Sequence, residues 1–213
     1  MTTFDLFTIG HSNIPAPRFT AMLRAAGANT IADVRSMPVS RFCPWFSAKN
    51  LAPLLAGEGM SYLFFGEELG GRPRDPSLYC EGIAGCEVAD YETMARQPSF
   101  EAGLERLLHD AGRHRLCLMC SEREPLDCHR CLLVARALAV RGAKIGHILY
   151  DGAIEPHATT EQRLLRLVDA DNDLFASGQH ARLAAAYRRR SRAVAYRIKK
   201  AANAATMRKE KSR

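Results

Sequence analysis

Short apolar runs alternate with amphipathic segments along the first 150 residues of the chain. Residues 5–10, 30–34, 61–65, 115–119 and 144–149 are the apolar runs, and their length is typical of buried strands. Between them, segments 16–26, 51–56, 99–108 and 130–141 repeat apolar residues at helical spacing. Alternating strands and helices predict βαβ units. We therefore expect an α/β fold of three layers, with a mostly parallel sheet of about five strands and helices on both faces.

Two segments of this region lack either pattern. Residues 35–45 contain two prolines, and residues 66–85 contain Gly70-Gly71-Arg72-Pro73, so we expect both to be loops. A loop as long as the second is uncommon in a compact domain and is often functional.

The last quarter of the chain predicts further helices. After Pro156, Thr159-Thr-Glu-Gln162 is a capping-box pattern that predicts a helix through Val168. Residues 169–178 form a polar break, and residues 179–213 lack Gly and Pro, so at least their first half should be helical. We accordingly divide the chain into an α/β domain, residues 1–158, and a helical, strongly basic extension, residues 159–213.

Positive charge is concentrated in that extension. The net charge of the chain is +7, but residues 188–213 hold eleven of its 30 Lys and Arg residues and a single acidic residue, Glu210. The rest of the chain therefore has a net charge of −3. Such a segment favours nucleic acid as a partner, and a solvated helical face is the alternative. The expected contacts are Arg188, Arg189, Arg190, Arg192, Lys199 and Lys200.

Cysteine usage and hydropathy indicate the compartment. The seven cysteines are odd in number and irregularly spaced, and no charged-then-apolar leader precedes them, so we expect reduced thiols and a cytoplasmic location. No segment reaches the roughly 20 apolar residues that cross a bilayer, which predicts a soluble protein without a membrane partner. The sequence specifies no oligomeric state.

Reactive and charged side chains follow four of the predicted strands. In an open parallel sheet, ligands bind beyond the carboxyl ends of the strands, so these side chains should meet at one crevice. The candidate catalytic residues are His11, Glu68, Cys120, Glu122 and His129, with a glutamate as general base and a histidine as acid. The candidate anion ligands are Ser12, Asn13, Arg35, Ser36, Arg41, Arg72 and Arg130. Trp45, close to Arg41, suits a planar base.

The segment from Cys120 to Arg130 has three interpretations. Its cysteines and His129 are ligand types suited to zinc, but the paired spacing of structural zinc sites is absent. Cys128 and Cys131 are spaced like a redox pair at a helix start. We favour the third interpretation, in which Cys120, His129 and Arg130 cradle a phosphate or carboxylate with the helix amides. We therefore expect no metal and no cofactor.

Several ordered motifs carry a family resemblance. They are Thr8-Ile-Gly-His-Ser-Asn13, Asp33-Val-Arg-Ser-Met-Pro38 with Ser40-Arg41, Leu69-Gly-Gly71, Leu118-Met-Cys120-Ser-Glu122, Cys128-His-Arg130 and Gly146-His-Ile148. Over about residues 4–158 they resemble the signature blocks of the domain of unknown function 488 family, which implies a compact α/β domain and no assigned activity. The order of elements is also distantly similar to rhodanese domains. The segment from Cys120 to Arg130 departs from the short glycine-rich catalytic loop of rhodanese.

These features together predict a protein that binds or acts on a phosphate-bearing ligand, either a nucleotide or a nucleic acid. A hydrolase or lyase of DNA repair or processing would fit. The alternatives are a thiol-dependent enzyme of rhodanese-like or redox type, and a non-catalytic module that binds nucleic acid or is stabilised by zinc.

Overall fold

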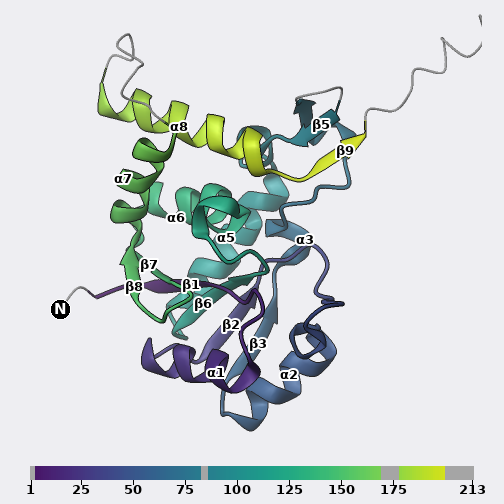
Figure 1. Ribbon diagram of the computed structural model, residues 1–213, viewed down its shortest axis with the longest axis vertical. Coiled ribbons are helices and arrows are strands. Elements are labelled where there is room, and N and C mark those ends of the chain that lie inside the picture. Colours follow the sequence, from purple (N-terminus) through teal and green to yellow (C-terminus); the bar gives the residue numbers. More distant parts are fainter. Residues whose placement is uncertain (1–2, 83–85, 169–177, 200–213) are drawn as a thin grey trace, which may run out of the picture.

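A mixed sheet of six strands forms the centre of the molecule. The computed structural model describes residues 3–82, 86–168 and 178–199. The strands lie in the order β3-β2-β6-β1-β7-β8 (Figure 1). Their bounds are Leu6–Gly10 for β1, Thr30–Asp33 for β2, Ser61–Phe64 for β3, Leu116–Cys120 for β6, Ile145–Ile148 for β7 and Ile154–Pro156 for β8. Five strands are parallel and only β8, at the edge, is antiparallel. The predicted α/β sheet is confirmed, with one short strand added.

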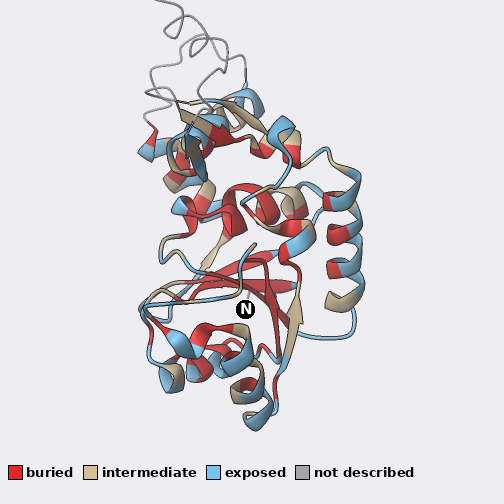
Figure 2. Cartoon of the chain, turned by 90° about the vertical axis from the view of Figure 1, so that its right-hand side faces the viewer, coloured by how far each residue is buried: buried red, intermediate tan, exposed pale blue. Residues whose placement is uncertain are grey.

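Helices cover both faces of this sheet. On one face, α1 (Ala16–Ala25) and α2 (Ala48–Gly57) pack apolar side chains such as Phe19 and Leu55 against the sheet. On the other face lie α5 (Pro98–Ala111), α6 (Arg136–Val140), α7 (His157–Leu167) and α8 (Gln179–Val194). Figure 2 shows the buried residues concentrated in the sheet and on the helix sides that face it. Two hydrophobic cores result, one on each face.

The strand order creates a crevice next to β6. The chain runs from β1 to β2 and β3 toward one edge, returns in β6 between β2 and β1, and continues to β7 on the far side of β1. The connection after β1 leads to α1 on one face, whereas the connection after β6 leads to α6 on the other. Ligand sites of open α/β sheets lie where neighbouring connections separate in this way. The loops after β1 and β6 therefore mark the functional edge.

The predicted long loop over residues 66–85 is wrong in part. It contains α3 (Gly66–Leu69), a 3₁₀ turn η2 (Pro76–Leu78) and β4 (Tyr79–Glu81). β4 pairs with β5 (Cys86–Ala89), and β5 pairs with β9 (Arg197–Lys199), in a second, antiparallel sheet. These strands have three or four residues. One of the two partners of β5, β9, comes from a segment far from it in the sequence. A local pattern does not reveal such a pairing.

The helices after residue 156 pack on the α/β domain. α7 begins at His157 without a side-chain cap, so the predicted capping box at Thr159 is wrong. The Thr160 hydroxyl bonds Glu155 and the Pro156 carbonyl. α8 confirms the predicted helix, and its Tyr187 belongs to the same core as the sheet. The predicted polar break falls on residues 169–178, of which 169–177 lie outside the described residues, as do residues 200–213.

A buried chain of hydrogen bonds joins the sheet to α7 and α8. The Thr8 hydroxyl lies 2.7 Å from His147 Nδ1, and His147 Nε2 lies 2.9 Å from His157 Nδ1. His157 Nε2 lies 3.1 Å from the Tyr187 hydroxyl, which donates to Glu161. If each group donates to the next, four protons satisfy four hydrogen bonds and both imidazoles stay neutral. Burial lowers the pKa of His147 and lowers that of His157 to about 4.

The buried histidines predict a loss of stability in weak acid. In the unfolded chain their pKa returns to about 6.5, so the unfolded state binds more protons below that pH. Above pH 6.5 the neutral histidines should cost no stability. As the pH drops from 6.5 toward 4, the free energy of unfolding should fall by up to about 1.4 kcal/mol per pH unit for each histidine. Urea denaturation at pH 7 and pH 5 measures the difference.

The control for this measurement is His109→Gln, which changes an exposed histidine and keeps the buried pair. His157→Gln should flatten the pH dependence between pH 7 and pH 5. An equally steep dependence in the His157→Gln protein would show that other groups cause the acid sensitivity.

Candidate metal centre

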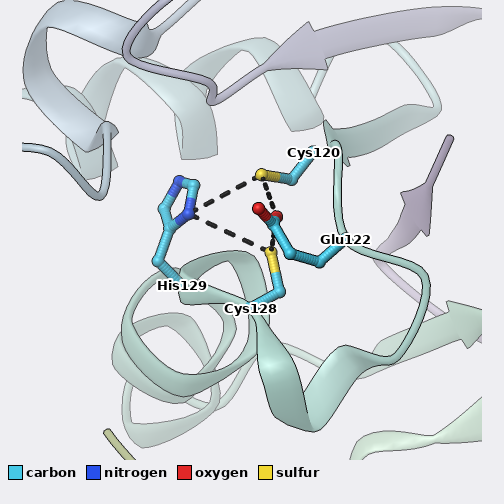
Figure 3. A group of neighbouring side chains, drawn as sticks. All are labelled: Cys120, Glu122, Cys128 and His129. Carbon is cyan, nitrogen blue, oxygen red and sulfur yellow. Dashed lines mark hydrogen bonds between the residues drawn. The ribbon is translucent and has the colours of Figure 1, made fainter. Parts of the chain in front are cut away.

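Four potential metal ligands meet where β6 ends (Figure 3). Cys120 is the last residue of β6, and Glu122 lies in the turn that follows. A 3₁₀ turn, η3 (Pro125–Asp127), then reverses the chain, with the Glu124 side chain accepting from the Leu126 N–H. This reversal returns Cys128 and His129 to the strand end immediately before η4 (Arg130–Ala135), a buried π-helical segment.

The side chains of this cluster face one another at short distances. Both thiols donate to the same Glu122 oxygen, at 2.9 Å from Cys120 and 3.0 Å from Cys128. His129 Nδ1 lies 3.6 Å from the first sulfur and 4.0 Å from the second. All four ligand atoms lie within 4.8 Å of one another. The two thiols are almost inaccessible, with Cys120 3% and Cys128 1% exposed.

The backbone fixes the orientation of His129. Its Nε2 lies 2.8 Å from the carbonyl oxygen of Val34, and a carbonyl can only accept, so Nε2 carries the proton. The lone pair of Nδ1 is then directed at the thiols. Histidines that bind metals are oriented in the same way, by a hydrogen bond from the other ring nitrogen. Gly71 packs against this ring so closely that an added Cβ would lie 2.6 Å from Cγ.

Arg130 is fully buried beside the cluster and holds the turn closed. Its NH1 and NH2 groups donate to the carbonyl oxygens of Glu122, at 2.6 Å, and Arg123, at 3.2 Å. Its Nε has no hydrogen-bond partner among the described residues, and its backbone N–H donates to the Cys128 sulfur. The expected cradle is thus not formed, because the guanidinium that should bind an anion faces the backbone and no solvent.

Proton affinities within the cluster are strongly coupled. Burial raises the pKa of Cys120, and the neighbouring Cys128 raises it further. Burial also raises the pKa of Glu122. For Cys128, hydrogen bonding from Cys120 and the charge of Arg130 outweigh burial and hold the pKa well below its ordinary value. Hydrogen bonding to Cys128 similarly outweighs burial at His129 and raises its pKa. Burial therefore opposes full ionisation of the acids unless further positive charge is present.

His11 and Arg35 belong to a second buried network, which adjoins the cluster: the His11 backbone N–H donates to the Cys120 carbonyl at 2.8 Å. Arg35 pairs with both carboxylate oxygens of Asp33, at 2.9 and 2.6 Å, and approaches His11 Nε2 at 3.1 Å. Burial lowers the pKa of His11 to about 4, and its ring stacks on Phe46. Tyr62 completes the network by donating to Asp33. All of these partners are internal, so the structure presents neither His11 nor Arg35 to a ligand.

Ser36, Glu68 and Arg72 line an open pocket of about 330 Å³ on the α5 side of the sheet edge. The backbone N–H of Arg72 donates to Ser36 Oγ at 2.9 Å. Glu68 forms an ion pair with Arg106 at 3.0 Å, and it is not part of the cysteine cluster. Ser12, Asn13 and Arg41 lie on the loops after β1 and β2, on the side of α1 and α2. The predicted crevice residues are therefore distributed over several neighbouring places.

The arginines of α8 mostly dock the helix on the body. Arg188 pairs with Glu92 at 3.6 Å, and Arg190 pairs with Asp127 and donates to the Leu126 carbonyl. Arg189 donates to the Val168 carbonyl. Arg192 and Lys199 are exposed, and Lys200 lies outside the described residues. Much of the expected nucleic-acid contact is thus engaged within the protein.

Cys128 is the site residue that the sequence-based selection missed. The sequence suggests it only as a zinc ligand or as the redox partner of Cys131, and in the structure the two sulfurs face different groups. Cys131 approaches His147 at 3.9 Å, whereas Cys128 faces Glu122. The short spacing between the end of β6 and Cys128 could have indicated this position. A compact turn after a strand brings the following residues back to the end of that strand.

Comparison with known proteins identifies a family for this chain but no activity. Residues 15–137 match the family model described as domain of unknown function DUF488. No curated protein and no solved structure matches the chain significantly. Within residues 3–82, 86–168 and 178–199, no helix combines the length and the apolar character that a bilayer span requires.

The contact between Gly71 and His129 predicts a sharp effect of one methyl group. Gly71→Ala should lower the free energy of unfolding by about 1–3 kcal/mol, because a Cβ 2.6 Å from the ring forces the buried imidazole or the loop to move. Chemical denaturation measures this change. Gly57→Ala is the matched control, since its Cβ meets nothing within 4 Å. Equal stability of the Gly71→Ala protein and the parent would contradict the close packing.

Proposed function

Because this chain belongs to the family of the domain of unknown function DUF488, whose description names no activity, we propose from the site alone that it is a zinc-binding domain. The proposed ligands are the sulfurs of Cys120 and Cys128, one Glu122 oxygen and Nδ1 of His129. The observation that carries the proposal is their convergence from two sides of a turn. No metal was expected from the sequence, because the spacing Cys-x-Glu-x5-Cys-His lacks the usual paired hooks.

The distances suit a tetrahedral ion. Zinc binds sulfur at about 2.3 Å and nitrogen or oxygen at about 2.0–2.2 Å, so neighbouring ligand atoms of a tetrahedral site lie about 3.6 Å apart. The separations of the two sulfurs from the Glu122 oxygen and from His129 Nδ1, 2.9 to 4.0 Å, bracket that value. Small shifts of the four side chains would complete the coordination. Thiolate and imidazole ligands together favour zinc over magnesium or calcium.

Charge balance gives independent support. With both cysteines and Glu122 ionised and His129 neutral, the ligands carry three negative charges. Zinc adds two positive charges, and the buried guanidinium of Arg130 adds the third. A buried cluster of zero net charge avoids most of the cost of removing charge from water. Without the cation, Cys120 and Glu122 retain their protons, in agreement with their raised pKa values, and Arg130 balances the charge of Cys128, whose pKa is lowered.

The ligand set indicates a stabilising role for the ion. Four protein ligands fill a tetrahedral shell, whereas catalytic zinc sites keep one position for water or substrate. The ion would tie the end of β6 to the start of η4 and would fix the turn between them. Because both thiols are buried, a thiol-dependent reaction of rhodanese-like or redox type has less support.

A second group of potential ligands does not share these properties. Cys131, His147 and His157 also lie close together, but hydrogen bonds along the chain from Thr8 to Glu161 already satisfy both imidazoles. Only one thiolate would offset a divalent ion there, and the charge of Arg130 lies nearby. We propose a single ion per chain. All seven cysteines lie among the described residues and none forms a disulfide, which supports a reducing compartment such as the cytoplasm.

The proposal predicts one zinc per chain and dependence of stability on that ion. At free zinc one hundred times the dissociation constant, binding should raise the free energy of unfolding by about 2.7 kcal/mol, and a chelator should remove this gain. Elemental analysis of the purified protein gives the stoichiometry. Substitution by Co²⁺ should produce the sulfur-to-cobalt absorption of a tetrahedral site with two thiolates.

Ligand variants sharpen this experiment. Mutation of a residue that hydrogen-bonds to a metal ligand typically lowers metal affinity about 10–100-fold. Cys128→Ser removes a ligand itself, so it should lower zinc affinity by more than this and should weaken the cobalt absorption. Cys80→Ser is the control, because Cys80 lies in β4 outside the cluster. A metal content that is the same in Cys128→Ser and Cys80→Ser proteins would refute the assignment.

The pocket lined by Ser36, Arg72 and Arg74 favours a second candidate function. Two arginines and a hydroxyl at the carboxyl ends of β2 and β3 suit a phosphate group, so this pocket would receive a phosphate-bearing ligand such as a nucleotide. A hydrolase or lyase of DNA repair or processing would use it for substrate, with Glu68 as the nearest candidate base.

This candidate predicts that Arg72→Ala weakens binding of a nucleoside monophosphate by about tenfold or more, the effect of one charge-assisted hydrogen bond. Isothermal titration calorimetry measures the affinity, and exposed Arg113, at the opposite edge of the sheet, supplies the control variant Arg113→Ala. Unchanged affinity in the Arg72→Ala protein would exclude this pocket as the phosphate site.

A further inference from the structure

Several exposed or half-buried aromatic and basic side chains lie on segments that follow the carboxyl ends of neighbouring strands, on the side of α1 and α2. They come from the first turn of α1, which follows β1, and from the loops after β2, β6 and β7, and these four strands are neighbours in the sheet. We call this surface the rim and define it by Arg18, Arg41, Phe42, Trp45, Arg123 and Tyr150. The rim lies next to the place where the connections after β1 and β6 turn to opposite faces of the sheet. It includes none of the proposed zinc ligands.

Two aromatic side chains of the rim, Phe42 and Trp45, are accessible to solvent. Phe42 is 95% exposed and Trp45 is 36% exposed, although large aromatic side chains are usually buried. The indole Nε1 of Trp45 donates to the Ile14 carbonyl at 3.1 Å, which anchors one edge of the ring. Exposed apolar residues that cluster on one loop indicate a binding surface.

The arginines of the rim are not neutralised, and two of them contact Tyr150. The Arg123 guanidinium lies 3.6 Å from the ring centroid of Tyr150, and that of Arg18 lies 5.1 Å from it. Arg18 also donates to the Tyr150 carbonyl at 2.7 Å. Neither of these arginines nor Arg41 has an ion pair with a carboxylate among the described residues. The rim therefore keeps three positive charges for an outside partner, although the body of the chain is slightly acidic.

We propose that the rim binds single-stranded nucleic acid. Unpaired bases would stack on Phe42 and Trp45, because every base has a flat face and base–aromatic stacking tolerates any sequence. The phosphates would contact the three arginines, whose guanidinium groups suit phosphate geometry. Duplex DNA hides its base faces, so the accessible rings favour single strands. The inference goes beyond the zinc centre and does not depend on it.

Trp45 provides a direct test, because it is the only tryptophan of the chain. The full-length, zinc-loaded protein should be titrated with oligothymidylate of about ten nucleotides, within the range of single-strand site sizes. Stacking should quench the tryptophan fluorescence, and the anisotropy of a labelled oligonucleotide should rise over the same concentrations. Three phosphate contacts should give a log–log salt slope of about −2.

Variants of exposed residues separate stacking from charge. Phe42→Ala should weaken binding by about tenfold, and Phe42→Tyr should retain it. Arg123→Ala should make the salt slope shallower by about 0.7. Val140 and Arg113 lie at the amino-terminal edge of the sheet, and Val140 is 81% exposed, so Val140→Ala and Arg113→Ala are matched controls that should bind like the parent.

Several results would overturn the proposal. Binding without a change in tryptophan fluorescence, or binding that Phe42→Ala leaves intact, would place nucleic acid elsewhere, for example on residues 188–213. A blue shift with phosphatidylserine vesicles and no response to oligothymidylate would make the rim a lipid-binding surface. Equal affinity for thymidine monophosphate would reduce it to a nucleotide site. Zinc content is measured separately, so failure of this inference and failure of the zinc assignment are distinguishable.

Discussion

The buried guanidinium of Arg130 is the constraint on which the edge of the sheet depends. It donates to two carbonyl oxygens of the turn after β6, and these bonds fix where Cys120, Glu122 and Cys128 can lie. Gly10 must lack a side chain because the Glu122 carbonyl occupies the place of its Cβ. A buried positive charge is costly unless negative groups surround it. The anionic cluster beside Arg130 is therefore a condition for its burial as well as a potential ligand set.

The layered architecture was predictable because its strands and helices carry their own periodicity. Five of the six strands of the central sheet are apolar runs, and the helices that cover them repeat apolar residues at helical spacing. The small sheet of β4, β5 and β9 was not predictable. Its strands have few residues, and pairing of Cys86 with Lys199 depends on three-dimensional contact and not on local sequence. The prediction of a capping box at Thr159 was wrong for a different reason. The helix already begins at His157, directly after Pro156, so Thr159 lies inside its first turn.

The sequence indicates which side chains can lie near the end of β6, but it does not indicate which of them are exposed. Glu122 and His129 lie beside Cys120 because the turn after β6 returns the chain to the end of that strand, and not because different strand ends converge there. The expected convergence of strand ends also suggested that Arg35 and Arg130 face a ligand, and both are buried with internal partners. Sequence shows which side chains can reach the edge of a sheet, but not which of them satisfy one another. Phe42 and Arg123 were missed because an exposed aromatic or an unpaired arginine has no sequence signature.

The hydrogen-bonded chain from Thr8 to Glu161 also constrains when the protein can fold during its synthesis. Thr8 belongs to the first strand of the domain, whereas Tyr187 belongs to a helix made long afterwards, and β5 receives its second partner only from residues 197–199. Contacts between such distant segments form slowly. Until α8 has been translated, His157 lacks the phenol that completes its hydrogen bonding, and β5 keeps an open edge. The nascent chain would expose that edge to other chains and to chaperones until residues 197–199 have been synthesised.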